Sequence, residues 1–128
     1  MMVAGIGCRK GAAREDILSA IETALEAHGL AITALTALAT APFKRDEPGI
    51  LAAARRLDLP LLVVDDEALA AAASRTLSHS QASQDAAATP SVSEASALAA
   101  AGGDATLLGP RTIVGPATCA IATSGATA

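Results

Sequence analysis

The stretch MVAGIGCRKGAAREDILSAIETALEAHG, residues 2 to 29, decides the fold class. It begins with an apolar run over 2–7 that ends at glycines, which predicts a buried strand. From Arg14 onward apolar residues recur at helical spacing, and Gly29 is a suitable stop, so we predict a helix between these two residues. The residues on its inner face are Ile17, Leu18, Ile21 and Leu25. A strand, a glycine turn and a helix in succession are typical of an α/β domain.

The same alternation continues along most of the chain. The run LPLLVV, residues 59 to 64, is the clearest further strand, and its continuous apolar character predicts burial on both faces. Asp46 and Pro48 mark the start of a helix that runs to about Leu57. Its inner face is predicted to consist of Ile50, Leu51, Ala54 and Leu57. Further strands are predicted over 35–40, 106–108 and 117–123, a short helix follows Asp65, Asp66 and Glu67 to about Ala73, and another helix spans Val92–Ala101.

This order predicts one domain over residues 1–128 with an α/β fold, in which a mixed, partly parallel sheet has helices on both faces. The polar, Ser-rich segment 74–91 interrupts the alternation. It is interpreted either as a flexible linker or as a short helix that begins at Ser80. Ser91 is a suitable N-cap for the helix that follows, and Glu94 falls at the third helical position, which completes a capping box.

The composition excludes several classes of protein. Hydrophobic residues make up 52% of the chain, but Phe43 is the single aromatic residue, so stacking of bases on aromatic side chains is nearly excluded. The net charge of −4 argues against nucleic-acid binding, which needs a basic field. No apolar run has the length of a membrane span, and the N-terminus lacks the pattern of a signal peptide, so we expect a cytoplasmic location. Two cysteines and no Cys/His cluster predict neither a disulfide framework nor a structural metal site.

The glycine turn GIGCRKGA, residues 5 to 12, has two interpretations. Its glycines lack the spacing of a dinucleotide loop, and the Gly-Lys-Ser/Thr of a Walker loop is missing. An anion is still favoured, because free backbone N–H groups at a helix start carry partial positive charge and two basic side chains stand beside them. The alternative is a plain strand-to-helix turn with solvated basic residues, and the two carry about equal weight. The ligand-binding candidates in this turn are Gly7, Cys8, Arg9, Lys10 and Gly11.

Cys8 could be a nucleophile whose pKa is lowered by the neighbouring cations and the helix terminus, but no nearby histidine stands as its base. A half-buried structural thiol is favoured over a nucleophile by roughly three to one. Cys119 lies in a predicted strand and is expected in the core. His28 and His79 are interpreted as surface residues, one at a helix end and one in a polar loop.

A second cluster of charge, FKRDEPG, precedes the helix that ends near Leu57. Lys44 or Arg45 could meet a carboxylate of a ligand, and Glu47 could carry out acid–base work. Alternatively, Asp46 caps the helix and the other charges are solvated. Glu94 is likewise either a capping residue or a proton carrier that faces the same ligand-binding cleft as this cluster. The candidates outside the glycine turn are Lys44, Asp46, Glu47, Ser91, Glu94 and Arg111, of which Glu94, Glu47 and Lys44 are the candidates for catalysis.

Four segments together resemble a known family of cobalamin-biosynthesis proteins. They are GIGCRKG, FKRDEPGILAAARRLDLPL, PSVSEASALAAAG, and LLGPR before the final TCAIA. In this order they are similar to CobE and to the C-terminal domain of CbiG proteins, and the resemblance covers essentially the whole chain. One departure is Ala88, where the family often has a glycine. The other CbiG parts are absent from the sequence, so we expect the stand-alone form of this domain.

The resemblance implies a role in making the corrin ring, in the aerobic route. Within this family, CbiG proteins open a lactone on the cobalt-bound macrocycle and release acetaldehyde. Three roles stay open for this chain: a carrier of a precorrin or corrin intermediate, a hydrolase or lyase acting on the precorrin ring, and a structural partner of another pathway enzyme. Corrin precursors carry many carboxylates, for which Arg9, Lys10, Lys44 and Arg111 are the expected contacts. No cofactor, metal, nucleic acid or membrane is expected as a partner.

Overall fold

The computed structural model of the chain describes residues 1–76, 79–80, 89–90 and 92–124. Its main sheet has the order β3-β2-β1-β8-β6, and β7 also pairs with β8. The first three strands are parallel, whereas β8 runs antiparallel to β1, so the predicted mixed sheet is confirmed. The strands are β1 (Met2–Cys8), β2 (Ala37–Thr40), β3 (Leu61–Val63), β6 (Ala105–Leu107), β7 (Thr112–Val114) and β8 (Ala117–Ser124).

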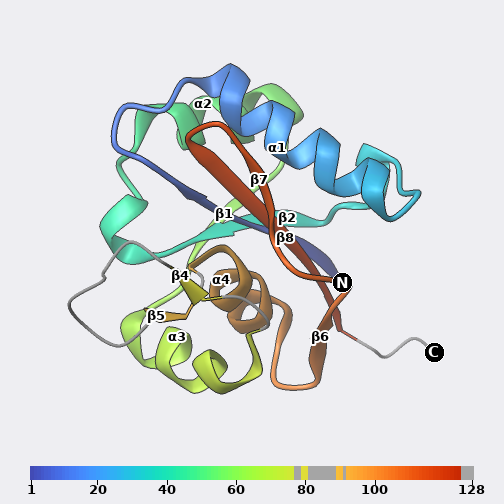
Figure 1. Cartoon of the computed structure of the whole chain (residues 1–128), viewed down its shortest axis with the longest axis vertical. Coiled ribbons are helices and arrows are strands. Elements are labelled where there is room, and N and C mark those ends of the chain that lie inside the picture. Colours follow the sequence, from blue (N-terminus) through green and yellow to red (C-terminus); the bar gives the residue numbers. More distant parts are fainter. Residues whose placement is uncertain (77–78, 81–88, 91, 125–128) are drawn as a thin grey trace.

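Helices cover both faces of the sheet, as predicted. Figure 1 shows α1 and α2 on one face and α3 and α4 on the other. The α-helices are α1 (Arg14–Ala27), α2 (Pro48–Leu57), α3 (Asp66–Ala72) and α4 (Val92–Ala101), and the short 3₁₀ turns are η1 (Ile32–Ala34), η2 (Pro42–Lys44) and η3 (Ala73–Arg75). No helix among the described residues is long and apolar enough to cross a bilayer.

Strand β1 separates the two cores of the domain. Because side chains alternate along a strand, Ile6 faces the core beneath α1 and α2 together with Ile17, whereas Val3 faces the core beneath α3 and α4 together with Leu98. The second core consists mostly of alanines, which bring α4 close to the sheet. A small-residue core therefore replaces aromatic packing.

The two glycines of β1 each leave room for a close neighbour, α4 at Gly5 and β8 at Gly7. A Cβ atom added at Gly5 would overlap the carbonyl oxygen of Ser93 and lie 2.7 Å from the backbone N of Ala97. One added at Gly7 would lie 2.8 Å from Oγ1 of Thr118. Gly5 thus makes room for α4, and Gly7 makes room for the Thr118 side chain of the adjacent strand β8.

Three sequence predictions are wrong in detail. The 59–64 run forms only the short edge strand β3, where Val63 is 42% exposed because β3 has a paired neighbour on one side alone among the described strands. In α2, Leu51 is exposed and Ala53 takes the inner position. The cap position of α2 is Glu47 and not Asp46, and it makes no side-chain capping bond. Strand β7 was not predicted at all.

The Ser-rich segment is described only in part. Residues His79–Ser80 (β4) and Thr89–Pro90 (β5) pair as a short antiparallel ladder. Because Ser80 lies in this strand pair, the helix that was predicted to begin at Ser80 does not begin there. Residues 81–88 with Ala88, and also Ser91 with its predicted capping role, lie outside the described residues.

Candidate functional site

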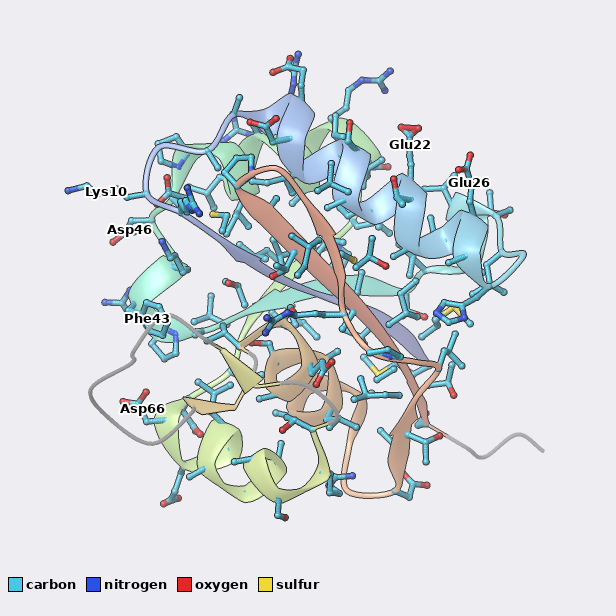
Figure 2. The ribbon with its side chains drawn as sticks, viewed as in Figure 1. Lys10, Glu22, Glu26, Phe43, Asp46 and Asp66 are labelled. Carbon is cyan, nitrogen blue, oxygen red and sulfur yellow. The ribbon has the colours of Figure 1, made fainter. Side chains whose placement is uncertain are left out.

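Three segments that are far apart in the sequence meet at the edge where β1 and β2 end. Parallel strands end at a common edge, so the loops after Cys8 and Thr40 lie side by side there. The backbone N–H of Arg9 donates to the carbonyl of Pro116 at 2.9 Å, which adds the β7–β8 turn to this edge. Figure 2 shows Lys10, Asp46 and Phe43 on this same side of the molecule. The two cation-bearing loops of the sequence analysis are therefore neighbours.

Glu47 joins these two loops. Its Oε1 accepts a hydrogen bond from the backbone N–H of Gly11 at 2.7 Å. Its Oε2 lies 3.9 Å from Nζ of Lys44, and only 10% of the Glu47 side chain and 16% of the Lys44 side chain are exposed. The carboxylate is thus largely used within the protein, because it neutralises a lysine and holds the glycine turn.

The glycine turn uses most of its own backbone donors. Gly11 has a φ of 82°, which glycine adopts without the strain that a side chain would add. The N–H groups of Arg9, Gly11, Ala12 and Ala13 donate to Pro116 O, Glu47 Oε1, Arg9 O and Asp16 Oδ2, respectively. The expectation of free N–H groups is wrong at these four positions. Any anion held here would depend on the exposed side chains of Arg9 and Lys10.

The Cys8 thiol is suited to a structural role. Cys8 is half-buried and packs against the core beneath α1 and α2. Burial raises the pKa of its thiol, and of the two charged neighbours Lys44 lowers this pKa while Glu47 raises it. The activated thiolate that a nucleophile needs is therefore disfavoured at neutral pH. Cys119 is fully buried, as expected, and its pKa is raised to about 12 by burial.

Glu94 lies in α4 and is buried against the side of the sheet where β6 and β7 pair with β8. Its exposed fraction is 0%, and its Oε2 accepts a hydrogen bond from the backbone N–H of Arg111 at 2.8 Å. Leu107 pairs with Ala122 and Thr112 with Cys119, so residues 108–111 stand opposite only residues 120–121. This bulge turns the Arg111 N–H away from the strand ladder, and Glu94 supplies the acceptor that it needs. Glu94 has no exposed surface in this structure, and its role as a proton carrier stays a prediction.

Two threonines that the sequence analysis did not single out hold the end of β1. Oγ1 of Thr40 donates to the carbonyl of Ile6 at 2.9 Å in a buried position, and Oγ1 of Thr118 donates to the carbonyl of Gly7 at 3.3 Å. Both hydroxyls come from strands adjacent to β1. Threonine is common in strands, so no local pattern could have distinguished these two positions.

Of the other predicted candidates, Asp46 lies at this edge and Arg111 lies at the bulge between β6 and β7. Asp46 is exposed beside Glu47, and Arg111 is partly buried at the bulge. Among the described residues, no group of three or more His, Cys, Asp or Glu side chains is placed to hold a metal ion. A separate open cavity of about 270 Å³ lies on the helical layer and is lined by Arg14, Ala52, Arg55 and Arg56.

Comparisons with known proteins agree on one family. Residues 2–122 match the family model described as "Cobalamin synthesis G C-terminus". The chain is 32% identical over 121 residues to the protein CobE of Sinorhizobium sp, covering 94% of this chain and 79% of that protein.

Two crystal structures are similar to the whole fold. One is of the cobalamin biosynthesis protein chiG from Agrobacterium tumefaciens, with 50% identity, a TM-score of 0.79, and coverage of 98% of this chain and 100% of that one. The other is of CobE, a protein from the cobalamin biosynthetic pathway, with 37% identity, a TM-score of 0.85, and coverage of 95% of this chain and 89% of that one.

Proposed function

The chain belongs to the family of cobalamin synthesis G C-terminal domains, a family of cobalamin-biosynthesis proteins, and we propose that it binds a carboxylate-rich precorrin or corrin intermediate. In this proposal it acts as a carrier or accessory module that passes the intermediate to another enzyme of the pathway. Membership of this family identifies the pathway as cobalamin biosynthesis. The choice of a carrier role depends on the chemistry of the edge where β1 and β2 end.

The observation that carries the proposal is the exposed pair Arg9 and Lys10 on a turn that Glu47 fixes in place. Charge-assisted hydrogen bonds from guanidinium and ammonium groups are strong contacts for carboxylates. The turn is held by the Gly11–Glu47 bond, so its two cations stand at a defined place at the sheet edge. Lys44, beside them, has Glu47 near its ammonium group.

The surroundings of the candidate catalytic residues favour a binding role over catalysis. Glu94 is buried and accepts a backbone hydrogen bond, Glu47 holds the glycine turn, and burial raises the pKa of the Cys8 thiol. Each group therefore has a structural partner or a protonation state that does not suit proton transfer or attack. A hydrolase or lyase activity is the second candidate, and the mostly buried Lys44–Glu47 pair next to Cys8 is the observation that favours it.

A visible absorption titration with hydrogenobyrinic acid and with pathway intermediates, followed over time, tests the proposal. We expect a saturable spectral shift that then stays constant. A shift that evolves into a new chromophore would support the enzyme instead, and the Glu94→Gln and Glu47→Gln variants would follow. No shift with any compound would leave the role of a structural partner.

The decisive variant is Arg9→Glu with Lys10→Glu, which should weaken binding. Its matched control is Arg55→Glu with Arg56→Glu, which makes the same charge change on an adjacent, exposed basic pair in the last turn of α2. Equal affinity in the first double variant and the wild type would remove the proposed site. Equal weakening in both double variants would indicate an effect of net charge alone.

A further inference from the structure

We infer that Phe43 is the apolar contact for one face of the bound macrocycle. This inference rests on the proposed function and adds an uncharged residue to the two cations of the proposed site. A corrin-type ring has two broad apolar faces and a rim of carboxylates. A site for it therefore needs an apolar surface close to cations, and the cations Arg9 and Lys10 account for the rim only.

Phe43 is exposed although burial would favour the fold. It is the only aromatic residue of the chain, and it is 69% exposed, more than any other large apolar side chain among the described residues. A phenylalanine in the core contributes strongly to stability. The two cores of this protein consist mostly of alanine and aliphatic residues, and the one aromatic ring lies outside both of them.

The ring is presented by a fixed turn. Phe43 lies in the middle of η2, where Lys44 N donates to Ala41 O at 2.9 Å and Arg45 N donates to Pro42 O at 3.2 Å. Ala41 on one side is fully buried, and the Lys44 side chain on the other side lies near Glu47. The backbone that carries the ring is thus already ordered, so a ligand that covers the ring does not have to order this turn.

The place of the ring matches the proposed ligand. Figure 2 shows Phe43 on the same side as Lys10 and Asp46, near the end of the sheet where the glycine turn lies. Val63, which is 42% exposed, pairs with Thr40, three residues before Phe43 in the chain. Exposed apolar surface and exposed cations thus occur on adjacent loops. This combination suits a flat apolar ring with a carboxylate rim.

Proton NMR can test this contact directly, because few aromatic protons are present. Apart from the imidazoles of His28 and His79, every aromatic C–H signal of the protein belongs to Phe43. With hydrogenobyrinic acid bound, we expect nuclear Overhauser effects between the Phe43 ring and methyl groups of the corrin. Phe43→Ala should weaken binding about tenfold, which is the size of one stacking contact, and Phe43→Leu should weaken it less.

The matched control is Ile113→Ala, since Ile113 is an apolar residue of β7 that is 61% exposed. Its affinity should equal that of the wild type. If the wild type binds and the Arg9/Lys10 double variant loses affinity, but Phe43 has no contact to the corrin and Phe43→Ala binds normally, the inference is overturned and the proposed function stands. If the wild type binds no compound, the proposed function fails and the inference fails with it.

Discussion

The carboxylate of Glu47 accepts a hydrogen bond at 2.7 Å from the backbone of Gly11, a residue 36 positions earlier in the chain. This bond connects the loop after β1 to the start of α2. It involves a side chain that is only 10% exposed. The acidic residue that the sequence suggested for acid–base work is thus a tether between the two loops that carry the candidate cations.

Glu47→Ala should destabilise the fold by about 1–3 kcal/mol, because the Gly11 N–H loses its acceptor and Lys44 loses its counter-charge. Glu47→Gln keeps an oxygen acceptor and should cost less. Urea denaturation of each variant measures these differences. Asp46→Ala is the neighbouring control, and it should stay within about 0.5 kcal/mol of the wild type because Asp46 is exposed and does not cap α2. Equal losses for Glu47→Ala and Asp46→Ala would contradict the tether.

Glu94→Ala should cost about 2–4 kcal/mol, since it removes the acceptor for the Arg111 N–H and leaves a cavity beneath the bulge. Glu94→Gln retains an acceptor oxygen and should be milder. The unfolding free energy is again the measure. A turnover assay with pathway intermediates distinguishes the roles: normal stability of Glu94→Gln with complete loss of a wild-type turnover would assign chemistry to this residue.

Regular elements with strong local signals were predictable from the sequence. Helix α4 begins at Val92 and ends at Ala101 as predicted, because Gly102 follows an unbroken helical run. Strand β1 and helix α1 were equally clear from the change in apolar spacing at the glycine turn. The family was also predictable from the sequence motifs, and the comparisons confirm it.

Features that depend on distant partners were not predictable. Strand β7 has three residues between Pro110 and Gly115, and it exists because β8 offers it a ladder. The exposure of Val63 depends on β3 being an edge strand, which an apolar run does not reveal. The roles of Glu47 and Glu94 depend on single backbone N–H groups brought near them by the fold, and no local spacing encodes such pairs.

Gly5→Ala should destabilise the protein by about 3 kcal/mol or more, because the new methyl group overlaps the Ser93 carbonyl and α4 must move away from β1. Thermal unfolding measures this loss. Gly103→Ala is the matched substitution, since a Cβ atom at Gly103 meets nothing within 4 Å. It should leave the melting temperature nearly unchanged. A similar melting temperature for both variants would show that the contact between α4 and β1 is not tight.

The stability of the protein should fall in alkaline solution in a way that depends on Cys119. Burial raises the pKa of this thiol from 9.0 to about 12, so the unfolded chain loses the proton first as the pH rises. The stabilising effect is therefore complete below pH 9 and is lost progressively toward pH 12, at up to about 1.4 kcal/mol per pH unit. The protein contains no tyrosine, so one common group that titrates in this range is absent.

Cys119→Ala isolates this contribution. The variant keeps Cys8, whose pKa is also raised by burial, so this second thiol affects both proteins alike. Urea denaturation at a series of pH values from 8 to 12 should give a steeper loss of unfolding free energy for the wild type than for the variant. Parallel curves would mean that the Cys119 thiol titrates as it does in the unfolded chain, and that the core beneath α1 admits water at this position.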